Sequence, residues 1–477
     1  MGPERAAMAA VACALLAACG VTARLTRPEG DGGWSPERRQ EEVARGAAEA
    51  LAPPAEPLTL ADALALAERG NRRVAEAERG LGEARERVWQ ARGQLLPSTT
   101  GSGRYTWYTD PQTTGVVLPP GLLQPGVPAP VVIVREAEFG VVNGTLTLPL
   151  DVTGELTHAL AAAQAGYRGE RARLWATRLA EQAGVVGAYF ELLAAERLRE
   201  VTEETIALDR QQLASAEQRF TNGRLTKNDL LVVQVAVRNA EQELRQRDLA
   251  LDRARWTLNQ TLGLPVDAPT RVADVHERPE VPPAPEALRL ARANNPALAA
   301  ILEEQQRLEE SAESLARGWL PRVAAGGAID YTTAKILQPQ RIGSGFVGFT
   351  WDLGTDGRRA AEIAEARLAV DRNRIAIARE LAELEAAVRG TGQAAEERLA
   401  ALDAAEASVA QAEENLRIRR QQFEAGRAMS DDVLRAEAIL AAERATLARA
   451  RYEAHTRRAE LQQLMGLPLD ALVAGTR

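Results

Sequence analysis

The chain contains one pattern twice, and this duplication constrains its fold more than any other feature. Early in the two copies, residues 63–97 resemble residues 287–321 at an offset of 224. Near their ends, the Gly-Leu-Pro sequence at 263–265 corresponds to 466–468 at an offset of 203. The first copy is therefore longer by the difference between the two offsets, and its additional residues fall in the proline-rich stretch 110–130. We extend the later register back to a glycine pair, Gly154 and Gly357.

The duplication divides the chain into segments. Residues 58–265 form the first repeat and residues 285–468 the second, with a linker at 266–284 and a tail at 469–477. Each repeat should open with a helix that a Leu-Pro pair ends, because proline lacks the N–H that a helix interior needs. We expect these helices over 60–94 and 285–318.

A long proline-free tract closes each repeat. No proline occurs between residues 151 and 264 or between 340 and 467, and the main break in each tract is a glycine, Gly223 or Gly426. A helix of about 65 residues would span roughly 100 Å at 1.5 Å per residue. After each glycine, apolar residues recur every seven positions, which predicts an antiparallel coiled-coil hairpin. These positions are Leu230, Val237, Leu244, Leu251 and Leu258, and Val433, Leu440, Leu447, Ala454 and Leu461.

Two strand-like runs precede the long helices of each repeat, at about 101–109 and 137–150 and at about 321–332 and 342–353. Polar and apolar residues alternate in them, which is typical of a sheet with two different faces. Aromatic residues gather in these runs, as in the girdle of a membrane barrel. An ordinary soluble hairpin covered by helices is the alternative. The aromatic residues are Tyr105, Trp107, Tyr108, Phe139, Tyr331, Phe346, Phe349 and Trp351.

The N-terminus has the pattern of a targeting segment. A short apolar run at 6–18 ends in Leu-Ala-Ala before Cys19, which resembles a bacterial lipoprotein signal. We expect a signal peptide at 1–18, acyl chains on Cys19, and a lipidated linker with a short helix at 19–57. Gly20 after the cysteine favours the outer membrane by the same resemblance. The alternatives are an ordinary secretory signal or a spanning helix, although a span needs about 20 apolar residues.

Composition argues against several other functions. The net charge is −8 and no basic, aromatic-rich patch occurs, so nucleic acid is not an expected partner. Of the two cysteines, Cys13 lies in the expected signal, and the three histidines are far apart in the sequence. No nucleophile motif, phosphate loop or metal-ligand cluster occurs, so we predict no enzyme, no metal and no cofactor besides the lipid. No apolar run after the signal is long enough for a spanning helix, so a membrane crossing would need strands.

The two helical turns carry a more specific pattern. Residues 220–231 and 423–434 each contain phenylalanine, glycine, then serine or threonine, and aspartate. With the duplication, the Gly-Leu-Pro ends and the β-hairpins, they resemble the TolC-like outer-membrane factor family, also called outer membrane efflux proteins, in its lipoprotein subtype. The resemblance covers nearly all of the chain from about residue 58. Within each turn, glycine would supply a positive φ, and Thr226 or Ser430 would cap the next helix.

The resemblance implies a mainly α fold with a small β part and a homotrimeric assembly. Each chain would give four strands to a twelve-stranded barrel in the outer membrane, and the long helices would form an α-barrel across the periplasm. The implied function is a passive channel for efflux or secretion. Its partners would be a periplasmic adaptor, an inner-membrane pump of the resistance-nodulation-division or ABC type, and outer-membrane lipid. The adaptor would dock at Gly223, Arg224, Leu225, Thr226, Gly426, Arg427 and Ser430.

By the same resemblance, Asp229 and Asp432 take the gate position, six residues after each glycine. A ring of carboxylates at a narrow mouth would attract cations. The chain departs from some relatives here, with Phe423 in place of a tyrosine and Arg435 in place of another aspartate. We expect Asp432 to pair with Arg435 or Arg427 and so latch the gate. The simpler alternative is a solvated aspartate that stabilises a helix N-terminus.

Two other classes of protein remain alternatives at this point. A periplasmic adaptor also has a coiled-coil hairpin and often a lipid anchor, but it has one hairpin between two lipoyl-like β halves. A structural coiled-coil lipoprotein would explain the helices but not the matched aromatic strands. The exported substrate, whether a drug, a metal or a protein, is left open by the sequence.

Overall fold

The structure, a computed structural model, describes residues 56–115, 131–223, 225–275, 277–353, 357–425 and 427–469. All of them lie in one compact unit, Ala52–Arg477. The expected signal peptide, Cys19 and nearly all of the expected tail fall outside the described residues.

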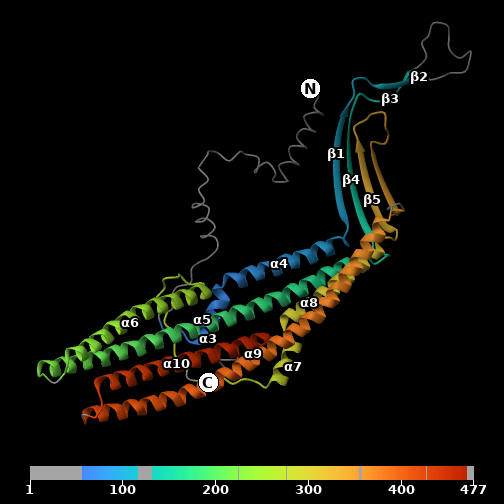
Figure 1. The fold of residues 1–477 in the computed structure, drawn as a ribbon. Helices are drawn as coiled ribbons and strands as arrows, with labels where there is room; N and C mark the ends of the chain where they lie inside the picture. The colour runs from blue at the N-terminus through green and yellow to red at the C-terminus, as the bar shows by residue number, and fades with distance from the viewer. Residues whose placement is uncertain are drawn as a thin grey trace, which may run out of the picture. The chain divides into compact units, whose positions relative to one another are not determined.

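Each repeat opens with two helices, not with the single helix predicted. The break falls at Asn71 in the first repeat and at Asn295 in the second, where the side-chain oxygen accepts hydrogen bonds from the first N–H groups of the following helix. Such a cap satisfies N–H groups that a helix start leaves without partners. The helices are α3 (Leu60–Gly70) and α4 (Arg72–Gly93), and α7 (Ala284–Asn294) and α8 (Pro296–Arg317) (Figure 1).

The Gly-Leu-Pro ends explain where these breaks lie. Gly263 and Gly466 have φ angles of 76° and 72°. A methyl group on Gly263 would lie 2.2 Å from the carbonyl oxygen of Gly70, and one on Gly466 would lie 2.2 Å from that of Asn294. Only glycine combines this backbone conformation with so close an approach. The end of each coiled-coil hairpin therefore packs directly on the helix break of its own repeat.

The two repeats contribute equally to one four-stranded antiparallel sheet. Its order is β1-β4-β5-β6, so the pairing of β4 with β5 joins the repeats. Each strand begins and ends within a few residues of the predicted bounds. The strands are β1 (Ser98–Trp107) and β4 (Glu138–Leu150) from the first repeat, and β5 (Arg322–Thr332) and β6 (Arg341–Thr350) from the second.

A second, two-stranded ribbon belongs to the first repeat alone. Strand β2 (Gln112–Gly115) pairs with β3 (Val131–Arg135) in antiparallel register. Strand β2 lies within the proline-rich stretch 110–130 that makes the first repeat longer than the second, and β3 begins directly after it. The sequence did not predict these strands, because the many prolines and glycines of this stretch are typical of a loop.

The long helices have equal lengths in the two repeats. Helices α5 (Glu155–Thr221) and α9 (Arg358–Glu424) each have 67 residues, or about 100 Å at 1.5 Å per residue. Both begin after a glycine with positive φ, Gly154 or Gly357. Helix α5 packs against α6 (Lys227–Leu262), and α9 packs against α10 (Ser430–Leu464), as Figure 1 shows. The two predicted coiled-coil hairpins and the offset of 203 are thus confirmed.

The predicted heptad positions lie inside these hairpins. Val237, Leu258, Val433 and Leu461 are buried, and the other heptad residues are buried or half-buried. Small residues such as Ala436 fill the spaces between them. The packing of the hairpins therefore follows from a pattern that is visible in the sequence.

A buried aromatic cluster joins the two hairpins near the linker. Phe190 of α5 stacks on His455 of α10 with ring centres 4.5 Å apart. The hydroxyl of Tyr189 lies 2.6 Å from the carbonyl oxygen of Ala273 and 3.0 Å from that of Leu58. Burial, with a smaller effect of nearby Arg458, lowers the pKa of His455 to about 4. This histidine is therefore neutral and packed.

No helix among the described residues is both long enough and apolar enough to cross a membrane.

Candidate functional site

The first helical turn has the geometry that its sequence predicts. Gly223 has a φ of +68°, and open space surrounds the position of its missing side chain, so the backbone conformation is what requires glycine. Thr226 is the N-cap of α6, and its hydroxyl accepts a hydrogen bond from the N–H of Asp229 at 3.2 Å. The same hydroxyl donates to the Asp229 carboxylate at 2.6 Å. Within one chain, Asp229, which was predicted as a gate residue, therefore stabilises the N-terminus of α6. Arg224 lies outside the described residues.

The second turn differs from the prediction at its cap. Helix α10 has Met429 as its N-cap, and Ser430 is already its first helical residue. The offset of 203 explains this difference, because Met429 and not Ser430 is the counterpart of Thr226. The Asp432 carboxylate accepts a hydrogen bond from the Met429 N–H at 3.0 Å. A carboxylate in the first turn thus replaces the missing hydroxyl cap.

The expected latch between Asp432 and Arg435 is not the pairing found within the chain. Arg435 instead pairs with Asp431 at 2.7 Å, four residues earlier on the same helix. Residues four positions apart are neighbours on the surface of a helix, which brings Arg435 next to Asp431. The Asp432 carboxylate is instead bound to the backbone N–H of Met429 at the start of the helix. The Arg427 side chain is exposed, and Gly426 lies outside the described residues. A gating role for these residues stays a prediction about the assembled protein.

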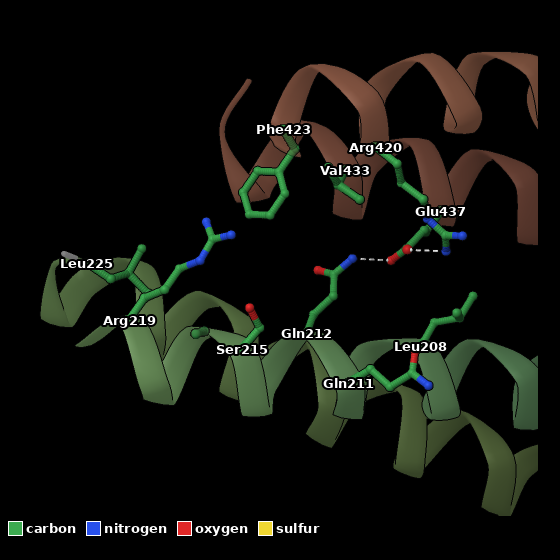
Figure 2. A pocket seen from close by; sticks show the side chains of 11 residues that line it. Leu208, Gln211, Gln212, Ser215, Arg219, Leu225, Arg420, Phe423, Val433 and Glu437 are labelled. Atoms are coloured by element: carbon green, nitrogen blue, oxygen red, sulfur yellow. Dashed lines mark hydrogen bonds and ion pairs between the residues drawn. The ribbon is translucent and has the colours of Figure 1, made fainter. Parts of the chain in front are cut away.

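A pocket of about 230 Å³ separates the two hairpins close to their turns. Figure 2 shows α5 on one side and α9 with α10 on the other. The guanidinium carbon of Arg219 lies 4.3 Å from the centre of the Phe423 ring across this gap. Phe423 was predicted as a gate residue, and Arg219 was not. The pocket is lined by Leu208, Gln211, Gln212, Ser215, Ala216, Arg219, Leu225, Arg420, Phe423, Val433 and Glu437.

A buried carboxylate forms the polar centre of this pocket. The Glu437 side chain is only 4% exposed, and it pairs with Arg420 of α9 at 2.9 Å. Gln212 of α5 donates to its other oxygen at 2.6 Å, so Glu437 connects the two hairpins (Figure 2). A buried charge without such partners would cost several kcal/mol. The comparison of the two repeats did not single out Glu437, because its counterpart in the first repeat is the uncharged Gln234.

A second acidic residue lies beside Glu437. Asp209 of α5 is buried, with 6% of its surface exposed. Burial raises the pKa of Asp209 to about 6, and the negative charge of Glu437 acts in the same direction. The contact between the hairpins therefore contains a carboxyl group that titrates near neutral pH.

One face of the sheet is mainly apolar, with Glu138 and Arg341 as charged exceptions, and the other is mainly polar, with Val141 and Ile342 as apolar exceptions. Directly opposed residues share a face, so the register assigns every side chain. Val347 and Phe349 face away from Ser344 and Thr350, as the alternation along this run indicates. The apolar face carries Tyr105, Trp107, Val142, Leu146, Leu148, Leu150, Val323, Ile329, Tyr331, Val347 and Phe349. The polar face carries Ser98, Thr100, Ser102, Arg104, Asn143, Thr145, Thr147, Asp330, Ser344 and Thr350.

The predicted aromatic girdle divides between these faces. Tyr105, Trp107, Tyr331 and Phe349 lie on the apolar face, whereas Phe139 and Phe346 lie on the polar face. The period of two along a strand separates odd from even positions, so only the first four share the face on which a lipid-facing girdle would lie. The girdle itself stays a prediction.

Four of the predicted girdle residues make local contacts. Tyr108 stacks on Phe139 with ring centres 6.3 Å apart. The ring of Phe346 covers Gly326, where a methyl group would lie 2.7 Å from it. Trp351, just after β6, donates a hydrogen bond from its indole N–H to the carbonyl oxygen of Trp319 at 3.0 Å.

The sequence matches the model of the outer membrane efflux protein family over residues 63–264 and 287–467, once in each repeat. The chain belongs to this family. The match confirms the family that the two turns indicated, the internal duplication and the outer-membrane efflux channel as the function of the chain. A comparison with curated proteins found no match.

Solved structures share the fold of this outer membrane efflux protein. CusC superposes with a TM-score of 0.72 at 15% identity, covering 86% of this chain and 92% of CusC. CmeC of Campylobacter jejuni gives 0.72 at 14% identity, with 85% of each chain covered. VceC of Vibrio cholerae gives 0.70 at 17% identity, covering 85% of this chain and 96% of VceC. The mainly α fold with a small β part is thus confirmed.

The described residues of this outer membrane efflux protein contain no group of three or more His, Cys, Asp or Glu side chains placed to hold a metal ion. His158 instead pairs with Glu310 at 2.7 Å, and His276 lies outside the described residues. The absence of catalysis and of cofactors stays a prediction, as does lipid attachment at Cys19.

Proposed function

We propose that three copies of this chain close into one channel, with a twelve-stranded barrel in the outer membrane and a helical duct in the periplasm. The observation that carries this proposal is that both coiled-coil hairpins are continuous with one sheet of two unlike faces. Strands β1 and β6 are the edges of that sheet. In a membrane every backbone N–H and C=O needs a partner, so β6 of one copy would pair with β1 of the next.

The faces of the sheet give the barrel its orientation. The face with Val347 and Phe349 would meet lipid, and the face with Asn143, Asp330 and Ser344 would line the aqueous passage. Asn143 donates a hydrogen bond to Asp330 on this polar face. A periplasmic adaptor or a coiled-coil lipoprotein without a pore would have no use for such a sheet.

The helical turns would form the periplasmic mouth and dock the adaptor of a tripartite efflux or secretion system. Met429 is 76% exposed and Phe220 is 40% exposed, so each turn presents apolar surface to a partner. The inner-membrane pump would be of the resistance-nodulation-division or ABC type. Asp229 and Asp432 lie in the first turns of α6 and α10, where a three-fold arrangement would gather their negative charge.

Acylation of Cys19 would anchor each copy in the outer membrane, because each buried methylene adds about 0.8 kcal/mol of membrane affinity. Metabolic labelling with a palmitate analogue should mark the full chain and not the Cys19→Ser variant. The variant should still reach the outer membrane if the barrel alone suffices for insertion.

The channel itself is tested with the full chain expressed in a Gram-negative strain that lacks its own export channels. We expect a trimer by light scattering in detergent, recovery in outer-membrane fractions, and stepwise conductance in planar bilayers that a polyvalent cation blocks from the periplasmic side. A monomer in the soluble periplasm would contradict the proposal.

A further inference from the structure

The pocket between the two hairpins has features of a binding site that the proposed channel does not use. Its volume of about 230 Å³ is larger than the roughly 150 Å³ of an apolar cavity that holds one benzene ring. Leu208 and Leu225 of the first hairpin and Val433 of the second give it apolar walls. All of the lining residues belong to one chain, so the pocket forms without a second copy.

Arg219 supplies a positive charge to this pocket. Figure 2 shows it at the opposite end from Glu437. Its guanidinium carbon lies 4.3 Å from the centre of the Phe423 ring. A guanidinium stacks through its flat face, so the N–H groups at its edge stay free to donate hydrogen bonds. Among the side chains that the structure describes, none forms an ion pair with Arg219.

Gln212 supplies a hydrogen-bond acceptor further along the pocket. Its amide nitrogen donates to Glu437 at 2.6 Å, whereas its Oε1 atom is buried and accepts no hydrogen bond within the described part of the chain. Figure 2 shows this oxygen on the side of the amide that faces Arg219. A buried amide oxygen without a donor costs free energy, and a ligand with an N–H or O–H group would recover it.

The charges of the lining favour an anion as the ligand. The buried Glu437 already has Arg420 at 2.9 Å and Gln212 as partners, so a cation would gain little there. The remaining charge among the lining residues is that of Arg219, because the buried Asp209 is not part of the lining. An anionic group beside Arg219 would gain a charge-assisted hydrogen bond.

The spacing of the two polar groups sets the length of the ligand. Gln212 and Arg219 are seven positions apart on α5, which is nearly two turns, so they lie on one face about 10 Å apart at 1.5 Å per residue. Ser215 lies between them and also lines the pocket. A ligand that reaches both groups therefore needs its anionic group and its donor at opposite ends of an apolar body.

We propose that this pocket binds a small amphipathic anion, with a carboxylate or similar group at Arg219, a hydroxyl or N–H donor at Gln212 Oε1, and an apolar body between the hairpins. Such a ligand would contact α5 together with α9 and α10, so it would stabilise the contact between the hairpins. The site goes beyond the proposed channel, because it needs neither a trimer nor an adaptor.

The probe for this site is para-coumarate, a rigid aromatic carboxylate with a phenolic hydroxyl at its far end. We expect saturable binding of one molecule per chain, measured by isothermal titration calorimetry on the full chain in a neutral detergent, with detergent alone as the blank. Cinnamate, which lacks the hydroxyl, should bind about five-fold more weakly. Para-ethylphenol, which lacks the carboxylate, should bind about ten-fold more weakly.

Variants of Arg219 test the contact with the anion. Arg219→Gln should weaken para-coumarate binding about ten-fold and leave para-ethylphenol binding unchanged, because only the carboxylate loses its partner. Arg219→Lys keeps the charge and should retain part of the affinity. Arg210→Gln is the matched control and should change nothing, because Arg210 is an arginine of the same helix that pairs with Glu241 outside the lining. Circular dichroism of each variant without ligand verifies its fold.

A variant of Gln212 tests the contact with the donor. Gln212→Met should remove the preference for para-coumarate over cinnamate. Because this preference is a ratio within one variant, a looser contact with Glu437 affects both ligands alike. As an independent readout, saturating para-coumarate should raise the unfolding temperature of the parent and not that of Arg219→Gln.

Three results would overturn the site. They are no saturable binding of para-coumarate by the parent, binding that neither Arg219→Gln nor Gln212→Met changes, and equal or tighter binding of tyramine, a phenol with a cationic group in place of the carboxylate. A parent that binds para-coumarate as a monomer by light scattering would overturn the channel and leave this site standing.

Discussion

The guanidinium carbon of Arg219 lies 4.3 Å from the centre of the Phe423 ring, and this contact joins the end of α5 to the end of α9. The counterpart of Arg219 in the second repeat is Gln422, which carries no charge. The duplicated turns therefore differ in the contact that each makes with the other hairpin. With Gln212 and Glu437, this pair holds the two hairpins together on either side of one pocket (Figure 2).

We expect Phe423→Leu to loosen the closed arrangement of the turns. An exposed cation–π pair contributes about 0.5–1 kcal/mol, so the open probability of single channels in planar bilayers should rise about two- to five-fold. Phe220→Leu is the matched control, because Phe220 is the counterpart in the first turn and has no such arginine over its ring among the described contacts. Equal effects of the two substitutions would remove the role of the pair.

Acidification should strengthen the contact between the hairpins. The pKa of Asp209 is raised to about 6, mainly by burial and then by Glu437. A carboxyl group with a raised pKa in the folded protein lowers the free energy of unfolding while it is ionised. This loss is complete above about pH 6 and disappears as the pH falls toward 3.8, the ordinary pKa of the group. At neutral pH the raised pKa lowers the free energy of unfolding by on the order of 3 kcal/mol.

The Asp209→Asn variant should show a smaller rise in stability from pH 7 to pH 5 than the parent, because the contribution of Asp209 is removed. Thermal denaturation of the full chain in detergent at a series of pH values measures the difference. Glu217→Gln, a change at an exposed carboxylate on the same helix, should leave the pH profile of the parent unchanged. A parent profile that lacks any rise in stability from pH 7 to pH 5 would contradict this account.

Gly263→Ala should destabilise the protein strongly. The new methyl group would lie 2.2 Å from the Gly70 carbonyl oxygen, on a backbone with a φ of +76°. We expect a loss of at least about 2 kcal/mol from strain and overlap together. Thermal unfolding followed by circular dichroism measures it. Gly184→Ala is the control, because open space surrounds this exposed position in α5 and alanine favours a helix.

Two positions on β6 test the assignment of the sheet faces. Val347→Arg places a charge on the apolar face, and Ser344→Arg places the same charge on the polar face. A charge that faces lipid near the middle of a membrane costs about 2–4 kcal/mol, whereas one that faces water costs little. The amount of heat-modifiable oligomer in outer membranes should therefore fall for Val347→Arg alone. A comparable loss for Ser344→Arg would contradict the assignment.

Patterns within one segment predicted much of this fold. The heptads, the two proline-free tracts and the positive φ of Gly223 depend on neighbours in the sequence, so they were visible there. The split helices were missed, although Asn71 and Asn295 correspond to each other at the offset of 224. An asparagine within a helical pattern of apolar residues looks like an ordinary helical residue unless its role as an N-cap is considered.

Contacts between segments could not be predicted in the same way. Asp209, Gln212 and Glu437 have polar side chains on long helices, and nothing near them in the sequence marks which face of α5 meets α10. The cap of α10 is a different case, because the constant offset already made Met429 the counterpart of Thr226. The prediction of Ser430 as the cap came from the chemical similarity of serine to threonine and not from this offset.

The equal 67-residue lengths of α5 and α9 restrict how such a chain can change in length during evolution. An insertion in one helix would shift its heptads against its partner unless the partner gained the same number of residues. It would also displace one turn from the other unless the second repeat changed in parallel. Length variation is therefore tolerated only where the copies need not match, as in the proline-rich stretch that the first repeat alone contains.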